Sequence, residues 1–148
     1  MSLRSINPVV VLALAALVGC AQQPVRTPDQ WVTEGVIKCK DRRPAQSGAG
    51  SQYGGFANVA RDAAEREYLN VVNELRTGDG VDALAHRTRM AMDPLEQFCA
   101  LEMLVRTDPD RARAIYAEVE SNPRLAYLIK RDAYLSEALK PYPLYKKQ

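Results

Sequence analysis

Apolar residues follow a helical period through most of the chain from residue 56 onward. Between residues 58 and 77 they recur at intervals of three and four, which places them on one helix face: Ala60, Ala64, Tyr68, Val71, Val72 and Leu75. Gly78-Asp79-Gly80 ends this stripe, and a shorter one follows from Val81 to Met92. The pattern predicts two amphipathic helices.

Three further helix starts share one short motif, an Asp or Asn followed by Pro. The Asx side chain can accept hydrogen bonds from the free amides of a first turn, and Pro suits the first helical position because it has no amide. The motifs Asp93-Pro94, Asp108-Pro109 and Asn122-Pro123 predict helices near 94–106, 109–121 and 123–140. The first of these helices is apolar around most of its circumference, so we expect it at the centre of a bundle.

The fold class that follows is all-α, an irregular bundle of about five amphipathic helices with short connections between antiparallel neighbours. The motif spacing of fifteen and then fourteen residues, with Ala114-Ile115-Tyr116 ahead of the last motif, resembles the end of a tetratricopeptide unit. That family needs a period of about 34 residues with small residues at set positions. We find no such period, which favours the irregular bundle over a repeat.

The chain on either side of these helices has a different character. Residues 21–30 are polar and contain two prolines, which predicts an extended tether. Residues 31–40 mix β-forming residues with a glycine, which indicates a short strand or an irregular segment. Residues 41–55 are rich in Gly, Ser and Ala and predict a flexible loop, and residues 141–148, again with two prolines, predict an extended tail.

Composition and charge narrow the class of protein. The 148 residues suffice for one domain of ordinary size, and 47% hydrophobic with 26% charged residues is the composition of a globular protein. The 20 basic and 18 acidic residues leave a formal net charge of +2, too balanced for the basic surface that binds nucleic acid. Beyond the N-terminus, no stretch is apolar for long enough to span a bilayer.

The N-terminus has the layout of a secretory signal. Arg4 is the only charged side chain before an uncharged apolar run from Val9 to Val18. This run is too short for a stable transmembrane helix, although an ordinary cleaved signal peptide or an N-terminal anchor helix would share its composition. The run ends at Leu17-Val18-Gly19-Cys20, which resembles the lipobox of bacterial lipoproteins.

This resemblance covers about the first 20 residues and implies lipid attachment without implying a fold. In that class the thiol of Cys20 receives diacylglycerol and a dedicated peptidase cleaves after Gly19. The acyl chains on Cys20 would then hold the protein on the membrane, because two or more chains suffice where one is marginal. Ala21 resembles an outer-membrane address, whereas Asp at that place tends to mean inner-membrane retention. The expected location is therefore the outer membrane, facing the periplasm.

The predicted organisation has four parts. Residues 1–19 are a signal peptide, and residues 20–55 are a lipidated tether followed by a short extended segment and a flexible loop. Residues 56–140 form the helical domain and residues 141–148 the extended tail. Cleavage after residue 19 would leave 129 of the 148 residues in the mature protein.

Two cysteines, Cys39 and Cys99, remain after lipidation of the third. An even pair in an oxidising compartment predicts a disulfide, which would fasten the segment after the tether to the central helix. The alternative is two buried free thiols, since Cys packs well as a small hydrophobic residue.

Tyrosines gather near the C-terminus. Tyr127 and Tyr134, seven residues apart, share a stripe beside the apolar face of the last predicted helix, and Tyr142 and Tyr145 follow in the tail. Tyr is enriched at protein interfaces, so these four residues are candidate interface residues, although the rings could equally cap the bundle core. A basic group near the tether could contact anionic headgroups or lie in a solvated loop: Lys38, Lys40, Arg42 and Arg43.

The residues that usually carry catalysis are sparse. His86 is the only histidine and lacks a local signature for a triad or a zinc site. Glu65 and Glu67 are two apart on a helix, where side chains diverge, so solvated ion pairs explain them better than a glycosidase pair. The sequence therefore predicts no catalytic residue, no metal and no cofactor.

The leading hypothesis is a non-enzymatic, lipid-anchored module that interacts with another envelope protein as an accessory or assembly subunit. It depends on the anchor at Cys20, the helical hairpins and the tyrosines of the C-terminus. The alternative is a module that binds a small apolar or lipid ligand between its helices at the membrane surface. A large internal cavity would favour the ligand, and an exposed apolar surface would favour the protein partner.

Overall fold

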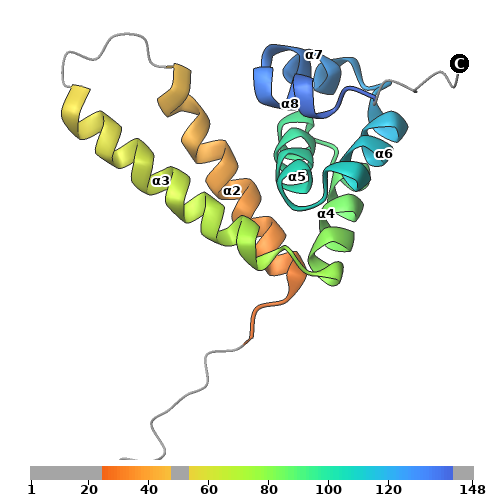
Figure 1. The fold of residues 1–148 in the computed structure, drawn as a ribbon, viewed down its shortest axis with the longest axis horizontal. Helices are drawn as coiled ribbons and strands as arrows, with labels where there is room; N and C mark the ends of the chain where they lie inside the picture. The colour runs from red at the N-terminus through yellow and green to blue at the C-terminus, as the bar shows by residue number, and fades with distance from the viewer. Residues whose placement is uncertain (1–24, 48–53, 142–148) are drawn as a thin grey trace, which may run out of the picture.

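A computed structural model describes residues 25–47 and 54–141, and these ranges contain seven helices and no strand. The helices are α2 (Pro28–Ser47), α3 (Gly54–Glu74), α4 (Gly78–Met90), α5 (Pro94–Thr107), α6 (Pro109–Val119), α7 (Pro123–Arg131) and α8 (Ala133–Ala138) (Figure 1). The predicted all-α class is confirmed. The number of helices exceeds the predicted five for two reasons, given below.

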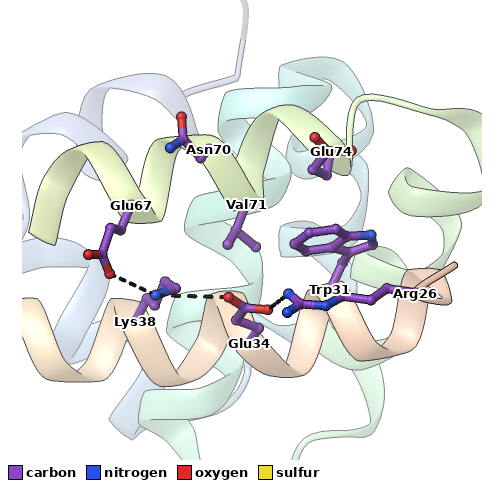
Figure 2. Close-up of a pocket in the computed structure, with 8 residues that line it drawn as sticks. All are labelled: Arg26, Trp31, Glu34, Lys38, Glu67, Asn70, Val71 and Glu74. Carbon is purple, nitrogen blue, oxygen red and sulfur yellow. Dashed lines mark hydrogen bonds and ion pairs between the residues drawn. The ribbon is translucent and has the colours of Figure 1, made fainter. Parts of the chain in front are cut away.

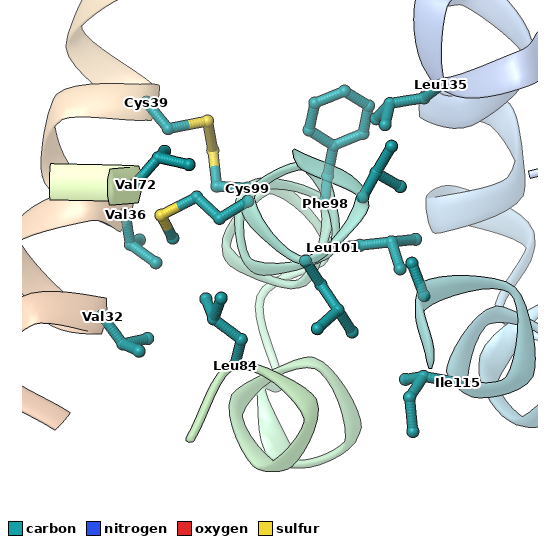
Figure 3. Packing of buried hydrophobic residues seen from close by; sticks show 14 of the residues in the cluster. Val32, Val36, Cys39, Val72, Leu84, Phe98, Cys99, Leu101, Ile115 and Leu135 are labelled. Carbon is teal, nitrogen blue, oxygen red and sulfur yellow. A yellow bond between two sulfur atoms is a disulfide. The ribbon is translucent and has the colours of Figure 1, made fainter. Parts of the chain in front are cut away.

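The central position of α5 is confirmed. Its residues 97–105 are all buried, and the helix contacts α2, α3, α4, α6, α7 and α8. Figure 3 views α5 along its axis, with the valines of α2 on one side and Leu135 of α8 on the other. Burial of apolar surface stabilises the fold, and a helix that is apolar around most of its circumference buries the most surface when neighbours cover every side. This is why α5 occupies the core.

Helices α2 and α3 form an antiparallel hairpin on one side of α5, while α6, α7 and α8 lie on the other side (Figure 1). Gly35 lies where α2 packs closely against α3 and α5. A Cβ atom on Gly35 would overlap Sδ of Met103 in α5 and lie 3.2 Å from Cγ1 of Val71 in α3. Glycine destabilises an isolated helix, but at this position its lack of a side chain permits three helices to pack tightly.

The predictions of a strand or irregular segment at 31–40 and of a loop at 41–47 and 54–55 were wrong, because α2 runs from Pro28 to Ser47 and α3 begins at Gly54; residues 28–30 of the predicted tether are helical as well, and residues 48–53 of the predicted loop lie outside the described residues. A capping box starts this helix: the Thr27 amide donates to Oε1 of Gln30 over 2.9 Å, and the Gln30 amide donates to Oγ1 of Thr27 over 3.3 Å. The β-branched residues of this segment suggested a strand, but burial of Val32, Val36 and Cys39 outweighs that weak preference. The helical domain therefore begins near residue 28 instead of residue 56.

The predicted helix 123–140 is two helices, α7 and α8, joined at Asp132. The Asp132 backbone is extended, with φ of −99° and ψ of 108°, and its side chain accepts a hydrogen bond from the Leu135 amide over 2.9 Å. An Asp that caps a new helix at this point lets the last turns change direction and keep Leu135 buried against α5. Within the described residues, no helix combines the length and apolarity that crossing a bilayer requires.

Candidate interaction surface

An apolar groove lies between the first turn of α5 and one side of α7. It has a volume of about 430 Å³ and is open to the surface. We call it the α5–α7 groove and define it by its lining residues: Asp93, Pro94, Leu95, Pro123, Arg124, Tyr127 and Leu128. Because both helices start with Pro, two positions that would present free backbone amides present apolar rings instead. The start motifs thus make this surface apolar.

Exposed apolar side chains extend the surface beyond the groove. Met92 is 95% exposed and Tyr127 57% exposed, and Met90 is exposed as well. Met90 and Met92 line a second hollow, with a volume of about 690 Å³, which shares Asp93 with the α5–α7 groove. Single exposed hydrophobic residues are normal, but several around two adjoining hollows are typical of a binding surface.

Buried hydrogen bonds hold the two walls of the groove in register. The Gln97 side chain, 5% exposed, donates from Nε2 to the Thr88 carbonyl oxygen over 2.8 Å. Its Oε1 accepts from Nδ2 of Asn122 over 3.0 Å, and Oδ1 of Asn122 accepts from the Arg124 amide over 3.1 Å. One glutamine of α5 therefore connects the end of α4 to the residue that starts α7.

On α7, Tyr127 points away from the core. Its hydroxyl accepts a hydrogen bond from Nη1 of Arg131 over 2.7 Å, and the Arg131 guanidinium carbon lies 5.5 Å from the ring centroid. Tyr134 lies on α8, where the guanidinium of Arg106 stacks 4.9 Å from its ring. The predicted common stripe of Tyr127 and Tyr134 was wrong, because Asp132 ends α7 between them. Tyr142 and Tyr145 lie outside the described residues.

A group of charged side chains around the buried ring of Tyr68, which we call the charge cluster, connects α2, α3 and α5: Arg42, Glu65, Tyr68, Glu102 and Arg106. Arg42 and Glu102 are buried, and Glu65 and Arg106 are partly exposed. The Arg42 guanidinium forms ion pairs with Glu102 and with Glu65, the latter at 2.7 Å, and stacks 4.0 Å from the Tyr68 ring. Arg106 binds Glu102 at 3.3 Å. Burial raises the pKa of the Tyr68 phenol, so this ring is neutral near pH 7.

The basic group near the tether makes ion pairs with other helices, which neither sequence interpretation anticipated. Lys38 is held 2.9 Å from Glu67 of α3, and this contact raises the pKa of Lys38. The other partners lie across the bundle: Lys40 with Asp93 at 2.7 Å, Arg42 with Glu65 and Glu102, and Arg43 with Asp132 at 3.3 Å. These four side chains therefore join helices and do not form a solvated loop.

A smaller hollow of about 230 Å³ lies between α2 and α3 (Figure 2). Trp31 covers one end, and the Arg26 guanidinium lies 4.6 Å from the Trp31 ring and is paired with Glu34. Lys38 lies 3.9 Å from Glu34 on the same helix. On the α2 side of the hollow, Arg26 and Lys38 both lie close to Glu34. We therefore assign the hollow a structural role in attaching the N-terminal segment to the hairpin.

The structure brings the two cysteines together. The sulfur atoms of Cys39 and Cys99 lie at disulfide distance, with their Cα atoms 5.8 Å apart, and the bond joins α2 to the central α5 (Figure 3). The separation of 60 residues means that it encloses the C-terminal part of α2, all of α3 and α4, and the start of α5. Gly19 and Cys20, the predicted cleavage and lipidation residues, lie outside the described residues.

The described residues contain no cluster of His, Cys, Asp and Glu side chains that could hold a metal ion. His86 is exposed beside Met90, and Glu65 and Glu67 each bind a cation of α2.

No protein-family model, curated protein or solved structure matches the chain. Both helix starts that form the α5–α7 groove were visible in the sequence, but their proximity was not, because it depends on how α7 packs on α5.

Proposed function

We propose that the protein is a lipid-anchored, non-enzymatic accessory protein of the bacterial envelope, and that it binds another envelope protein through the α5–α7 groove. One observation carries the proposal: an open apolar groove, lined in part by exposed Tyr127, adjoins at Asp93 a second hollow that is lined in part by exposed Met92. Water-exposed apolar surface is unfavourable in a monomer, and burying it against a partner recovers that free energy. Tyr and Met are also enriched where proteins meet.

The lipid anchor supports a location at the membrane. Helix α2 begins at Pro28, eight residues after Cys20 of the lipobox, and an extended chain of that length spans about 29 Å at most. Lipid on Cys20 would therefore hold the start of α2 close to the bilayer. Ala21 supports an outer-membrane location facing the periplasm. A disulfide between Cys39 and Cys99 suits this oxidising compartment.

Site-specific photo-crosslinking in cells tests the interaction. A photoreactive amino acid replaces Tyr127 in one strain and Arg66, an exposed residue of α3, in another. We expect a reproducible adduct with one envelope protein from position 127 and none from position 66, because only position 127 lines the groove. Equal labelling at both positions, or no adduct at position 127, would contradict the proposal.

Substitution of the lipobox cysteine tests the anchor. We expect Cys20→Ser to leave a soluble or signal-retaining protein, because serine cannot form the thioether that carries diacylglycerol. Membrane fractionation of the variant beside the wild-type protein measures this directly. Unchanged anchoring with a cleaved signal would contradict the lipoprotein assignment. The Cys39→Ala, Cys99→Ala double variant is the matched control, since it removes the other thiols and should remain in the membrane fraction.

A small apolar or lipid ligand is the second candidate, and the size of the groove favours it. A volume of about 430 Å³ lies within the range of small-molecule sites, about 300–1,000 Å³. Mass spectrometry of organic extracts from the purified protein distinguishes the two. One lipid or metabolite recovered in stoichiometric amount, and displaced by Leu128→Trp, would replace the protein partner as the occupant.

A further inference from the structure

One exposed side of α7 combines positive charge with apolar contact area. Arg124, Tyr127, Leu128 and Arg131 occupy positions i, i+3, i+4 and i+7 of the helix, so they share one face. Arg124, Tyr127 and Leu128 line the α5–α7 groove, and Arg131 is fixed to Tyr127 by a hydrogen bond of 2.7 Å. We call these four residues the α7 ridge.

The charge of the α7 ridge is not balanced within the described residues. Helix α7 contains Arg124, Lys130 and Arg131 and no acidic residue. Neither arginine of the ridge forms an ion pair with a carboxylate in the described parts of the chain. Two acidic residues beside the ridge are already occupied: Asp93, which lines the groove, binds Lys40 at 2.7 Å, and Asp132, which follows Arg131, binds Arg43 at 3.3 Å.

We propose that the α5–α7 groove receives an acidic segment of a partner protein, in which Asp or Glu residues flank one large apolar side chain. This inference rests on the proposed function and specifies the chemistry of the partner. The apolar side chain would cover Leu95 and Leu128 in the floor of the groove. Its carboxylates would bind Arg124 and Arg131, whose planar guanidinium groups can each donate two parallel hydrogen bonds to a carboxylate.

A protein segment fits the surface better than an anionic membrane does. The apolar residues line one open groove of about 430 Å³, which is small beside the broad surface that a bilayer presents. The chain also leaves the lipid anchor at the start of α2, and Figure 1 shows α7 at the opposite end of the molecule from that start. An anchor at Cys20 would therefore attach to the fold at a distance from α7.

Peptide selection tests this chemistry without knowledge of the partner. A phage library of random peptides is selected on the immobilised full chain, and the enriched consensus peptide is titrated by fluorescence anisotropy. We expect enriched peptides to carry Asp or Glu around one large apolar residue. Their binding should weaken as salt is raised from about 50 to about 500 mM, because exposed charge pairs are screened.

Two charge reversals on α7 locate the binding site. Arg124 lines the groove, and Lys130 lies on another side of the same helix; both are exposed, so neither substitution should disturb folding. We expect Arg124→Glu to weaken the consensus peptide by about tenfold and Lys130→Glu by less than about twofold. Arg124→Gln, which removes the charge without reversing it, should have an intermediate effect, and circular dichroism verifies that all three variants are folded.

Several outcomes would overturn the inference: enrichment of neutral or basic peptides, no enrichment at all, or equal effects of Arg124→Glu and Lys130→Glu. Vesicles of phosphatidylglycerol and phosphatidylethanolamine are titrated in parallel. Binding of vesicles but of no peptide, with the same dependence on Arg124, would assign the ridge to a membrane instead. A crosslinked partner from position 127 with a neutral contact segment would refute only this inference, whereas peptide binding without any cellular adduct would refute only the proposed function.

Discussion

Arg42 shows how one residue can organise a small core. It is 7% exposed, and its guanidinium is shared by Glu65 of α3 and Glu102 of α5 while it stacks on Tyr68. Burying charge is costly, and only several close partners make it tolerable. Three helices therefore have to meet in one arrangement for this side chain to be satisfied, which makes the charge cluster a determinant of how the hairpin docks.

We expect Arg42→Met to lower the free energy of unfolding by about 3–5 kcal/mol, because the substitution leaves the Glu102 carboxylate buried without its closest partner. Urea denaturation measures the change. Arg66→Met, at an exposed position of the same hairpin, is the control and should be nearly neutral. The double variant Arg42→Met, Glu102→Leu should recover much of the loss. A loss of less than about 1 kcal/mol for Arg42→Met would contradict this account.

The contact between Lys40 and Asp93 makes stability depend on pH. The hydrogen bond from Lys40, followed by that from the Leu95 amide, holds the pKa of Asp93 below its ordinary value. A carboxyl group whose pKa is lower in the folded state stabilises the fold above its unfolded pKa of about 3.9, and this contribution is lost as pH falls through the folded value.

We therefore expect the stability difference between the wild-type protein and Asp93→Asn to be constant near neutral pH and to shrink below about pH 4. Asn is the suitable replacement because it can still cap α5 while it loses the charge. Urea midpoints for both proteins from neutral to acidic pH provide the measurement. A difference that does not vary with pH would show that the charge on Asp93 contributes nothing.

At the scale of elements, short side chains decide where helices begin. Thr27 with Gln30 starts α2, Asp93 and Asn122 start the two helices of the α5–α7 groove, and Asp132 separates α7 from α8. Each of these side chains satisfies amides that a helix cannot satisfy internally. The last case matters most for function, because it ends the α7 ridge after Arg131 and turns Tyr134 toward Arg106.

Asp132→Ala should reduce the free energy of unfolding by about 1 kcal/mol, the usual cost of losing an N-cap, with a further loss from the broken pair with Arg43. Asp132→Asn separates the two effects, because it retains the cap and removes the ion pair. Chemical denaturation of both variants, with the exposed Glu137→Ala as a control, measures them. If Asp132→Ala were as stable as the wild-type protein, the break between α7 and α8 would not depend on this cap.

At the scale of the whole molecule, the α2–α3 hairpin attaches to the remainder mainly through α5 and α4. The disulfide between Cys39 and Cys99 lies in the middle of that attachment, beside the charge cluster and the ion pair of Lys40 with Asp93. Covalent and ionic contacts thus reinforce one interface. The α5–α7 groove lies on the other part of the molecule and depends on the hairpin through Asp93.

Reduction of the disulfide tests this arrangement. We expect reductant to lower the free energy of unfolding by up to about 4 kcal/mol, because the bond closes a loop of 60 residues in the unfolded chain. Urea denaturation with and without reductant gives the value. The Cys39→Ala, Cys99→Ala double variant should not respond to reductant at all. Wild-type protein that was equally stable in both conditions would contradict a stabilising bridge.

The sequence by itself determined the features that local chemistry controls. The Asx-Pro motifs specified the starts of α5, α6 and α7, because a cap acts within its own first turn. The apolar circumference of α5 specified the centre of the bundle, because hydrophobic burial depends on the residues of that helix. The lipobox at Cys20 remains a prediction from the sequence. Thr27-Pro28-Asp29-Gln30 is a local signal for the start of α2, because Thr27 and Gln30 cap the helix. The β-forming residues that follow it favoured a strand or irregular segment instead, which was wrong.

Only the tertiary structure decided the features that depend on contacts between distant residues. It placed Arg42 between two carboxylates, split the last predicted helix at Asp132, and set the starts of α5 and α7 beside each other to form the groove. Residues such as Glu65 and Glu102 are far apart in the chain. The pattern of apolar and polar residues within one helix does not predict which side chains of another helix will contact it. Caps and stripes are encoded locally, whereas the pairing of charges and the shape of a surface arise when the helices pack together.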